Sequence, residues 1–153
     1  MRALVITHGG IGLELVNVVQ QIMGPVPGLT AMSNRGKSAQ EITALIKDWL
    51  GGATDAIAGE GIPGEAIPGE AIPGETIFGE PGKALVLIDD YGGSCATASQ
   101  LACGPDPDVA IISGVNLAML LGYVTWRETT EFKVLVRKLV EKGREAITIV
   151  GAR

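Results

Sequence analysis

Residues 84–94 read ALVLIDDYGGS, an uninterrupted apolar run that ends in two carboxylates and continues into a glycine-rich turn. Such a run is typical of a strand that is buried on both faces, as the strands of a parallel sheet are. Two more runs share this form, ALVIT at residues 3–7 and VAIIS at Val109–Ser113, and weaker strand patterns occur at Leu29–Ser33 and at residues 146–150. These patterns therefore predict the strands of a parallel sheet.

Helical patterns separate these strands. A capping box formed by Ser38 and Glu41 opens a helix over Ala39–Leu50. Further apolar residues at helical spacing occur at residues 13–23, 94–102, 117–126 and 131–142, with Gly143 as the expected end of the last helix. The alternation of strands and helices predicts an α/β fold with an open, mainly parallel sheet, right-handed crossovers and helices on both faces.

The composition is that of one domain with an aliphatic core. The chain has 153 residues, of which 46% are hydrophobic and only 4% aromatic, and its formal net charge is −5. This acidity argues against nucleic-acid binding, which needs a basic surface. Cys95 and Cys103 have no second pair of cysteines with which to build a metal site or a disulfide framework, so we expect reduced thiols in a cytoplasmic protein. The uncharged stretch at residues 109–126 divides into a strand, a turn and a helix, which argues against a membrane span.

A pentapeptide repeat interrupts this pattern at residues 59–82. It reads GEGIP-GEAIP-GEAIP-GETIF-GEPG, and its Pro-Gly steps are typical of type II turns. We expect a tolerated surface insertion in a single domain that spans residues 1–153; a docking or spacer element is the alternative. The repeat carries five glutamates and no Lys or Arg, so the rest of the chain has 12 acidic and 12 basic residues and is formally neutral.

His8, the single histidine of the chain, directly follows the strand pattern at residues 3–7. Asp89 directly follows the pattern at Ala84–Ile88. If these two strands are neighbours, His8 and Asp89 meet at the carboxyl ends of the strands, where open α/β sheets bind ligands. A carboxylate that accepts the Nδ1–H of the imidazole leaves Nε2 free as a nucleophile. The alternative is a solvated turn histidine with no role.

Gly92, Gly93 and Ser94 open the next expected helix, whose N-terminal amides are suited to bind a phosphate. Ser94 has two compatible roles, as a donor to the phosphate and as the N-cap of this helix. The chain contains no nucleophile elbow and no P-loop motif, and a metal site would have only Asp89 and Asp90 to build on. These residues favour phosphoryl transfer through a phosphohistidine, without a metal or an organic cofactor.

Several segments resemble the IIA domain of the mannose/fructose/sorbose family of the bacterial phosphoenolpyruvate-dependent sugar phosphotransferase system. The resemblance lies in VITHG around His8, LVLIDDYGGS at residues 85–94, IISGVNLAMLL at residues 111–121 and GREAITIV at residues 143–150. It covers nearly the whole chain outside the repeat.

The resemblance implies a phosphotransferase. His8 would accept a phosphoryl group from the phosphocarrier protein HPr and pass it to a IIB component for sugar uptake, while Asp89 pairs with this histidine and Ser94 and the following amides receive the phosphate. It also implies a cytoplasmic homodimer in which a last, antiparallel strand at about residues 146–150 is exchanged between the subunits. Peripheral association with a membrane permease fits the same picture.

The chain also departs from the family pattern. Cys95, Ala96 and Thr97 stand where the family has Pro, Phe and Asn, and Ala118 replaces a proline. Asp90 stands where the family commonly has an apolar or neutral residue; it would repel the phosphate if it pointed inward and would be solvated if it pointed outward. Asn116 either helps to order the loops of the crevice or serves as a turn former.

Two other functions stay open. The first is a regulatory module in which the phosphorylation state of His8 controls protein binding without sugar transport. The second is a small-molecule-binding domain with an inert histidine.

Overall fold

The computed structural model describes residues 1–52 and 82–151. In chain order, the elements of these residues are β1 (Arg2–Thr7), α1 (Ile11–Met23), β2 (Leu29–Ser33), α2 (Ala39–Leu50), β3 (Ala84–Ile88), α3 (Ser94–Cys103), β4 (Val109–Ser113), α4 (Leu117–Trp126) and α5 (Phe132–Glu145). The predicted repeat at residues 59–82 lies outside the described residues, apart from Gly82.

The strands form a four-stranded, parallel sheet in the order β2-β1-β3-β4. β1 and β3 are the inner strands, and Ile6 pairs with Ile88 in their register. All five residues of β3 are buried, as its continuous apolar run predicts. The predicted open parallel sheet is confirmed, and the weaker pattern at Leu29–Ser33 forms the edge strand β2.

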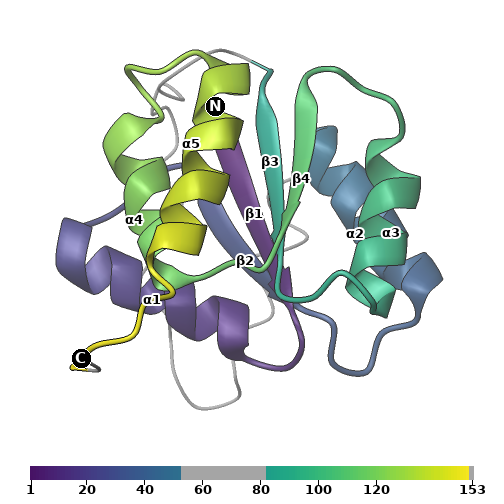
Figure 1. Ribbon diagram of the computed structural model, residues 1–153. Helices are drawn as coiled ribbons and strands as arrows, with labels where there is room; N and C mark the ends of the chain where they lie inside the picture. The colour runs from purple at the N-terminus through teal and green to yellow at the C-terminus, as the bar shows by residue number, and fades with distance from the viewer. Residues whose placement is uncertain (53–81, 152–153) are drawn as a thin grey trace.

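Helices cover both faces of the sheet (Figure 1). α1, α4 and α5 pack on one face, and α2 and α3 pack on the other. Each face of the sheet therefore has its own hydrophobic core, the first under α1, α4 and α5 and the second under α2 and α3. Because successive side chains of a strand point to opposite faces, Val5 belongs to the first core and its neighbour Ile6 to the second. Burial on both faces explains why the inner strands lack the polar alternation of a half-exposed sheet.

The predicted capping box at the start of α2 is present. The backbone N–H of Ser38 donates to Glu41 Oε2 over 2.7 Å, and the backbone N–H of Glu41 donates to Ser38 Oγ over 3.3 Å. Two amide hydrogens that no helical carbonyl can accept are satisfied in this way. The helix that follows buries Trp49 against the second core.

The uncharged stretch at residues 109–126 divides into β4, a turn and α4, as expected. Gly114, in the turn, has a φ of +83°, which a glycine adopts without strain. Among the described residues, no helix has the length and apolar character that crossing a membrane requires.

The end of α5 differs from the prediction. The helix continues past Gly143 to Glu145, so Gly143 is not its end. A Cβ on Gly143 would lie 2.8 Å from Met119 Cε and 3.0 Å from Asn116 Nδ2. The glycine is therefore explained by close packing of α5 on α4, rather than by a helix stop.

The expected strand at residues 146–150 pairs with none of the strands in residues 1–52 and 82–151. Ile147, Ile149 and Val150 are exposed by 83%, 82% and 91%. The antiparallel exchange of this segment between two subunits involves a second copy of the chain and stays a prediction.

A close contact between Thr7 and Gly12 holds the turn between β1 and α1. The Thr7 side chain is buried, and its Oγ1 accepts a hydrogen bond of 2.6 Å from the backbone N–H of Gly12. A Cβ on Gly12 would lie 2.9 Å from Thr7 Oγ1 and 3.0 Å from Val5 Cγ1. Only glycine allows α1 to begin this close to β1, and this approach positions the turn that carries His8.

We expect Gly12→Ala to lower the free energy of unfolding by about 2 kcal/mol, because the added methyl group meets two stiff β-branched side chains. Gly10→Ala is the matched control, since a Cβ at that position would meet nothing within 4 Å; it should cost less than about 1 kcal/mol. Urea denaturation of the two variants measures the difference. Equal losses would contradict this account of the turn.

Candidate functional site

His8 and Asp89 meet at the carboxyl ends of the two inner strands. His8 follows β1 and Asp89 follows β3, and the two strands are hydrogen-bonded neighbours. Asp89 Oδ2 lies 2.8 Å from His8 Nδ1 and also accepts a hydrogen bond of 2.8 Å from the backbone N–H of His8. The His8 side chain is 51% exposed and that of Asp89 only 17%. The contact expected from the sequence is present.

The environment of Asp89 favours its ionised form. Partial burial raises the pKa of the carboxyl, but hydrogen bonds from the backbone and ring of His8 and from the backbone N–H of Asp90 outweigh it, so the pKa lies below its ordinary value. An ionised carboxylate only accepts hydrogen bonds, so the hydrogen of the contact with His8 resides on Nδ1. Nε2 then carries a lone pair and can act as a nucleophile.

Gly93 lies against the imidazole ring of His8. A Cβ on Gly93 would lie 3.1 Å from His8 Cε1 and 3.4 Å from His8 Nε2, so a side chain here would crowd the ring. Gly93 also occupies the N-cap position of α3, and no side chain caps this helix. The start of α3, which no side chain caps, therefore lies next to the His8 ring, where its amides are suited to bind an anion.

The other residues of the glycine-rich turn have different surroundings. Ser94 is the first residue of α3 and does not cap it, so the N-cap role considered for Ser94 is wrong. Gly92, Asp90 and Tyr91 are exposed, and the position of Asp90 agrees with an outward, solvated carboxylate.

Asn116 serves α4. Its Oδ1 accepts a hydrogen bond of 3.0 Å from the backbone N–H of Met119, and its Nδ2 donates to the carbonyl oxygens of Gly114 and Gly143. These contacts make Asn116 the N-cap of α4 and tie the turn after β4 to α5. They favour the turn-former interpretation over a direct part in the site.

The turn after β2 contributes two residues that the sequence interpretation missed. Asn34 Oδ1 accepts a 3.4 Å hydrogen bond from the backbone N–H of Gly9. The backbone N–H of Asn34 donates to the backbone carbonyl of Thr7 over 3.1 Å. Arg35 Nη2 lies 3.4 Å from the point where a Cβ on Gly9 would be. Because β1 lies between β2 and β3, Arg35 and Asp89 flank His8 from opposite sides.

Cys95 lies beneath the His8–Asp89 pair. The thiol is buried, and its burial, together with the charge of Asp89, raises its pKa, while hydrogen bonds with the side chains of Asn34 and Ser94 oppose this rise. A ring nitrogen of His8, a carboxylate oxygen of Asp89 and Cys95 Sγ all lie within 4.8 Å of one another. These three atoms are possible metal ligands, whereas the sequence had suggested only Asp89 and Asp90.

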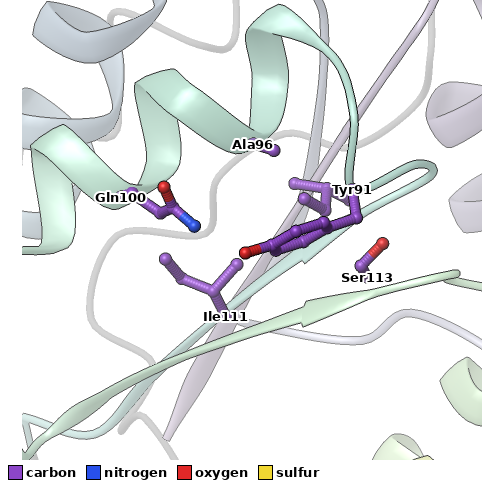
Figure 2. Close-up of a pocket in the computed structure, with 6 residues that line it drawn as sticks. Tyr91, Ala96, Gln100, Ile111 and Ser113 are labelled. Atoms are coloured by element: carbon purple, nitrogen blue, oxygen red, sulfur yellow. The ribbon is translucent and has the colours of Figure 1, made fainter.

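A small pocket adjoins the site but does not contain it (Figure 2). It has a volume of about 140 Å³ and is lined by Ile88, Tyr91, Ala96, Gln100, Ile111 and Ser113. The Tyr91 ring extends over it toward Ile111. Neither His8 nor Asp89 lines this pocket.

Comparison with known proteins places these features in context. The family model for the PTS system fructose IIA component (EIIA-man) matches residues 32–140. This match includes the segment from Asp89 to Ser94 but not His8. No curated protein matches the sequence.

Solved structures share the fold at low sequence identity. EIIA from Streptococcus agalactiae is 19% identical over 97% of this chain and 95% of its own, with a TM-score of 0.70. The mannose/sorbose-specific IIA subunit from Enterococcus faecalis is 20% identical over 99% and 96%, also with a TM-score of 0.70. The PTS IIA protein associated with the fucose utilization operon of Streptococcus pneumoniae is 14% identical over 97% and 91%, with the same TM-score of 0.70.

We expect the neutral His8 ring to carry its hydrogen on Nδ1, because Asp89 accepts it. Long-range proton–nitrogen NMR spectra of protein labelled with ¹⁵N-histidine report this tautomer without overlap, since His8 is the single histidine. Asp89→Ala should move the population toward the Nε2–H tautomer, and Asp90→Ala, which removes the exposed neighbouring carboxylate, should not. An Nε2–H tautomer in the unmodified chain would contradict this geometry.

Proposed function

The chain belongs to the PTS fructose IIA (EIIA-man) family, and from this premise we propose that it carries a phosphoryl group on His8, accepts it from HPr and passes it to a IIB component. One observation carries the proposal: the single histidine pairs with Asp89 over 2.8 Å and faces the uncapped start of α3. A cytoplasmic location and a role in sugar uptake are part of the same proposal.

The His8–Asp89 contact suits Nε2 for in-line attack on phosphorus. As the bond from phosphorus to HPr breaks and the bond to Nε2 forms, the imidazole ring gains positive charge. Asp89 accepts the Nδ1–H throughout and stabilises this charge. Transfer to the IIB component reverses the same steps, because the ring returns to its neutral form when the phosphoryl group leaves.

The start of α3 suits the oxygens of the transferred group. Gly93 lets the imidazole approach the helix, and the amides that follow present hydrogen-bond donors at the positive end of the helix dipole. In phosphoryl transfer, positioning and stabilisation of charge supply most of the catalysis. We assign Ser94 and these amides to the phosphoryl oxygens.

Arg35 is suited to neutralise the phosphoryl group from the other side. Its guanidinium lies beside the turn that carries His8, and among the described residues it forms no ion pair. The site already holds the carboxylate of Asp89, so an incoming dianion benefits from a nearby cation.

A homodimer is the assembly we propose for this carrier. Ile147, Ile149 and Val150 expose their apolar side chains almost completely in the single chain. Pairing of residues 146–150 with the sheet of a second copy would bury them.

We expect phosphoenolpyruvate, enzyme I and HPr to label the chain with acid-labile, base-stable phosphate. His8→Ala should abolish the label, and Asp90→Asn, which changes an exposed carboxylate of the same crevice, should keep it. Labelling with radioactive phosphoenolpyruvate measures both. Undiminished labelling of His8→Ala would contradict the proposed acceptor.

We expect Arg35→Ala to slow labelling by phospho-HPr roughly 10- to 100-fold, because the variant loses a hydrogen bond to a charged group. Arg35→Lys should recover part of the rate, because it restores the charge without the planar fork. Arg137→Ala, an exposed arginine on α5, is the control and should be labelled normally. Unchanged initial rates for Arg35→Ala in rapid-quench measurements would exclude this role.

A further inference from the structure

We propose that His8, Asp89 and Cys95 form a binding site for a thiophilic divalent cation such as Zn²⁺, and that the bound cation blocks phosphorylation of His8. The binding step stands on the geometry of the chain alone. The inhibitory consequence rests on the proposed function.

The three side chains converge from separate elements. His8 follows β1, Asp89 follows β3, and Cys95 lies in the first turn of α3. Their ligand atoms lie within 4.8 Å of one another, and the closest pair, His8 Nδ1 and Asp89 Oδ2, is 2.8 Å apart. Ligand atoms around a tetrahedral Zn²⁺ lie roughly 3 to 4 Å apart, given its bond lengths of about 2.0–2.3 Å. Side-chain adjustments of about an ångström would therefore produce a three-ligand site.

The donor set suits zinc. An imidazole nitrogen, a carboxylate oxygen and a thiolate sulfur are its usual protein ligands, and a water molecule would complete a fourth position. The site is layered, because the His8 side chain is half exposed, that of Asp89 is only 17% exposed and Cys95 is buried. A cation can therefore enter from solvent past His8 and meet the sulfur at the bottom of the crevice.

A neighbouring backbone group already orients one of the ligands. The backbone N–H of Asp90 donates to Asp89 Oδ1 over 3.0 Å, which leaves Oδ2 turned toward His8. A hydrogen bond to a metal-ligating side chain holds that ligand in place and raises the affinity of a metal site.

Metal binding and phosphorylation require different states of the same imidazole. When the cation binds the Nδ1 lone pair, the ring hydrogen moves by way of solvent from Nδ1 to Nε2, and the thiol of Cys95 releases its proton to solvent. Nε2 then has no lone pair with which to attack phosphorus. The cation also takes the Asp89 oxygen that would stabilise the transferred state. The two ligands are therefore mutually exclusive.

Cobalt titration tests the binding step without any phosphotransfer partner. One equivalent of Co²⁺ should produce the near-ultraviolet charge-transfer band of a cobalt–thiolate bond. Cys95→Ser should abolish the band, while Cys103→Ser should keep it, because Cys103 is the other buried cysteine and lies at the far end of the same helix. His8→Ala should weaken cobalt binding at least tenfold.

Circular dichroism shows whether each variant is folded, and Cys95→Ala is a second variant at the same position. Absence of the charge-transfer band in the unmodified chain would overturn the proposal. A band that survives in a folded Cys95 variant would do the same.

Zinc inhibition tests the consequence. Labelling is started with purified phospho-HPr, so that enzyme I is absent, and one equivalent of Zn²⁺ should lower the initial rate for the unmodified chain at least tenfold. Cys95→Ser should be labelled at its own zinc-free rate, and a chelator should restore the unmodified chain. Equal inhibition of both proteins would overturn the inhibitory role. If the chain is not labelled even without zinc, the proposed carrier function fails while the cobalt spectra still decide the metal site.

Discussion

The contact between His8 Nδ1 and Asp89 Oδ2 is the interaction on which the site depends. It requires β1 and β3 to be neighbours, so that the residues after Ile6 and Ile88 meet at one edge of the sheet. It also requires the close start of α1 at Gly12 and the close approach of Gly93 to the ring. The chemistry of the ring thus follows from backbone placement: one carboxylate oxygen holds the ring hydrogen on Nδ1, and the opposite nitrogen is left to react.

Electrostatic balance decides what this crevice can hold. Without a ligand, Asp89 is stabilised by hydrogen bonds from His8, and Asp90 faces solvent. A phosphoryl dianion adds negative charge, which the start of α3 and Arg35 are placed to offset. A divalent cation instead adds positive charge, which the carboxylate of Asp89 and the thiolate of Cys95 would offset as its ligands. The tautomer of one imidazole therefore selects between two ligands of opposite charge.

Much of the fold and part of the site could be predicted from local signals in the sequence. Continuous apolar runs predicted β1 and β3 as buried strands, and the Ser38–Glu41 capping box predicted the start of α2. The run at Val109–Ser113 also forms a strand, but full burial was the wrong prediction there, because β4 lies at the edge of the sheet and only Ile112 is buried. Asn34 and Arg35 were missed because their role depends on the strand order, which brings the end of β2 beside His8. Gly143 was misread because close packing and helix ends both favour glycine, and only the contact with Met119 and Asn116 distinguishes them.

The central claim is that Nε2 of His8 bears the phosphoryl group while Nδ1 keeps its hydrogen bond to Asp89. Because the chain has a single histidine, ¹⁵N-histidine labelling followed by phosphorylation places the new bond directly by NMR. The account predicts a one-bond phosphorus–nitrogen coupling to Nε2 and a protonated Nδ1. A coupling to Nδ1, or a phosphorylated chain without any phosphorus–nitrogen coupling, would contradict it.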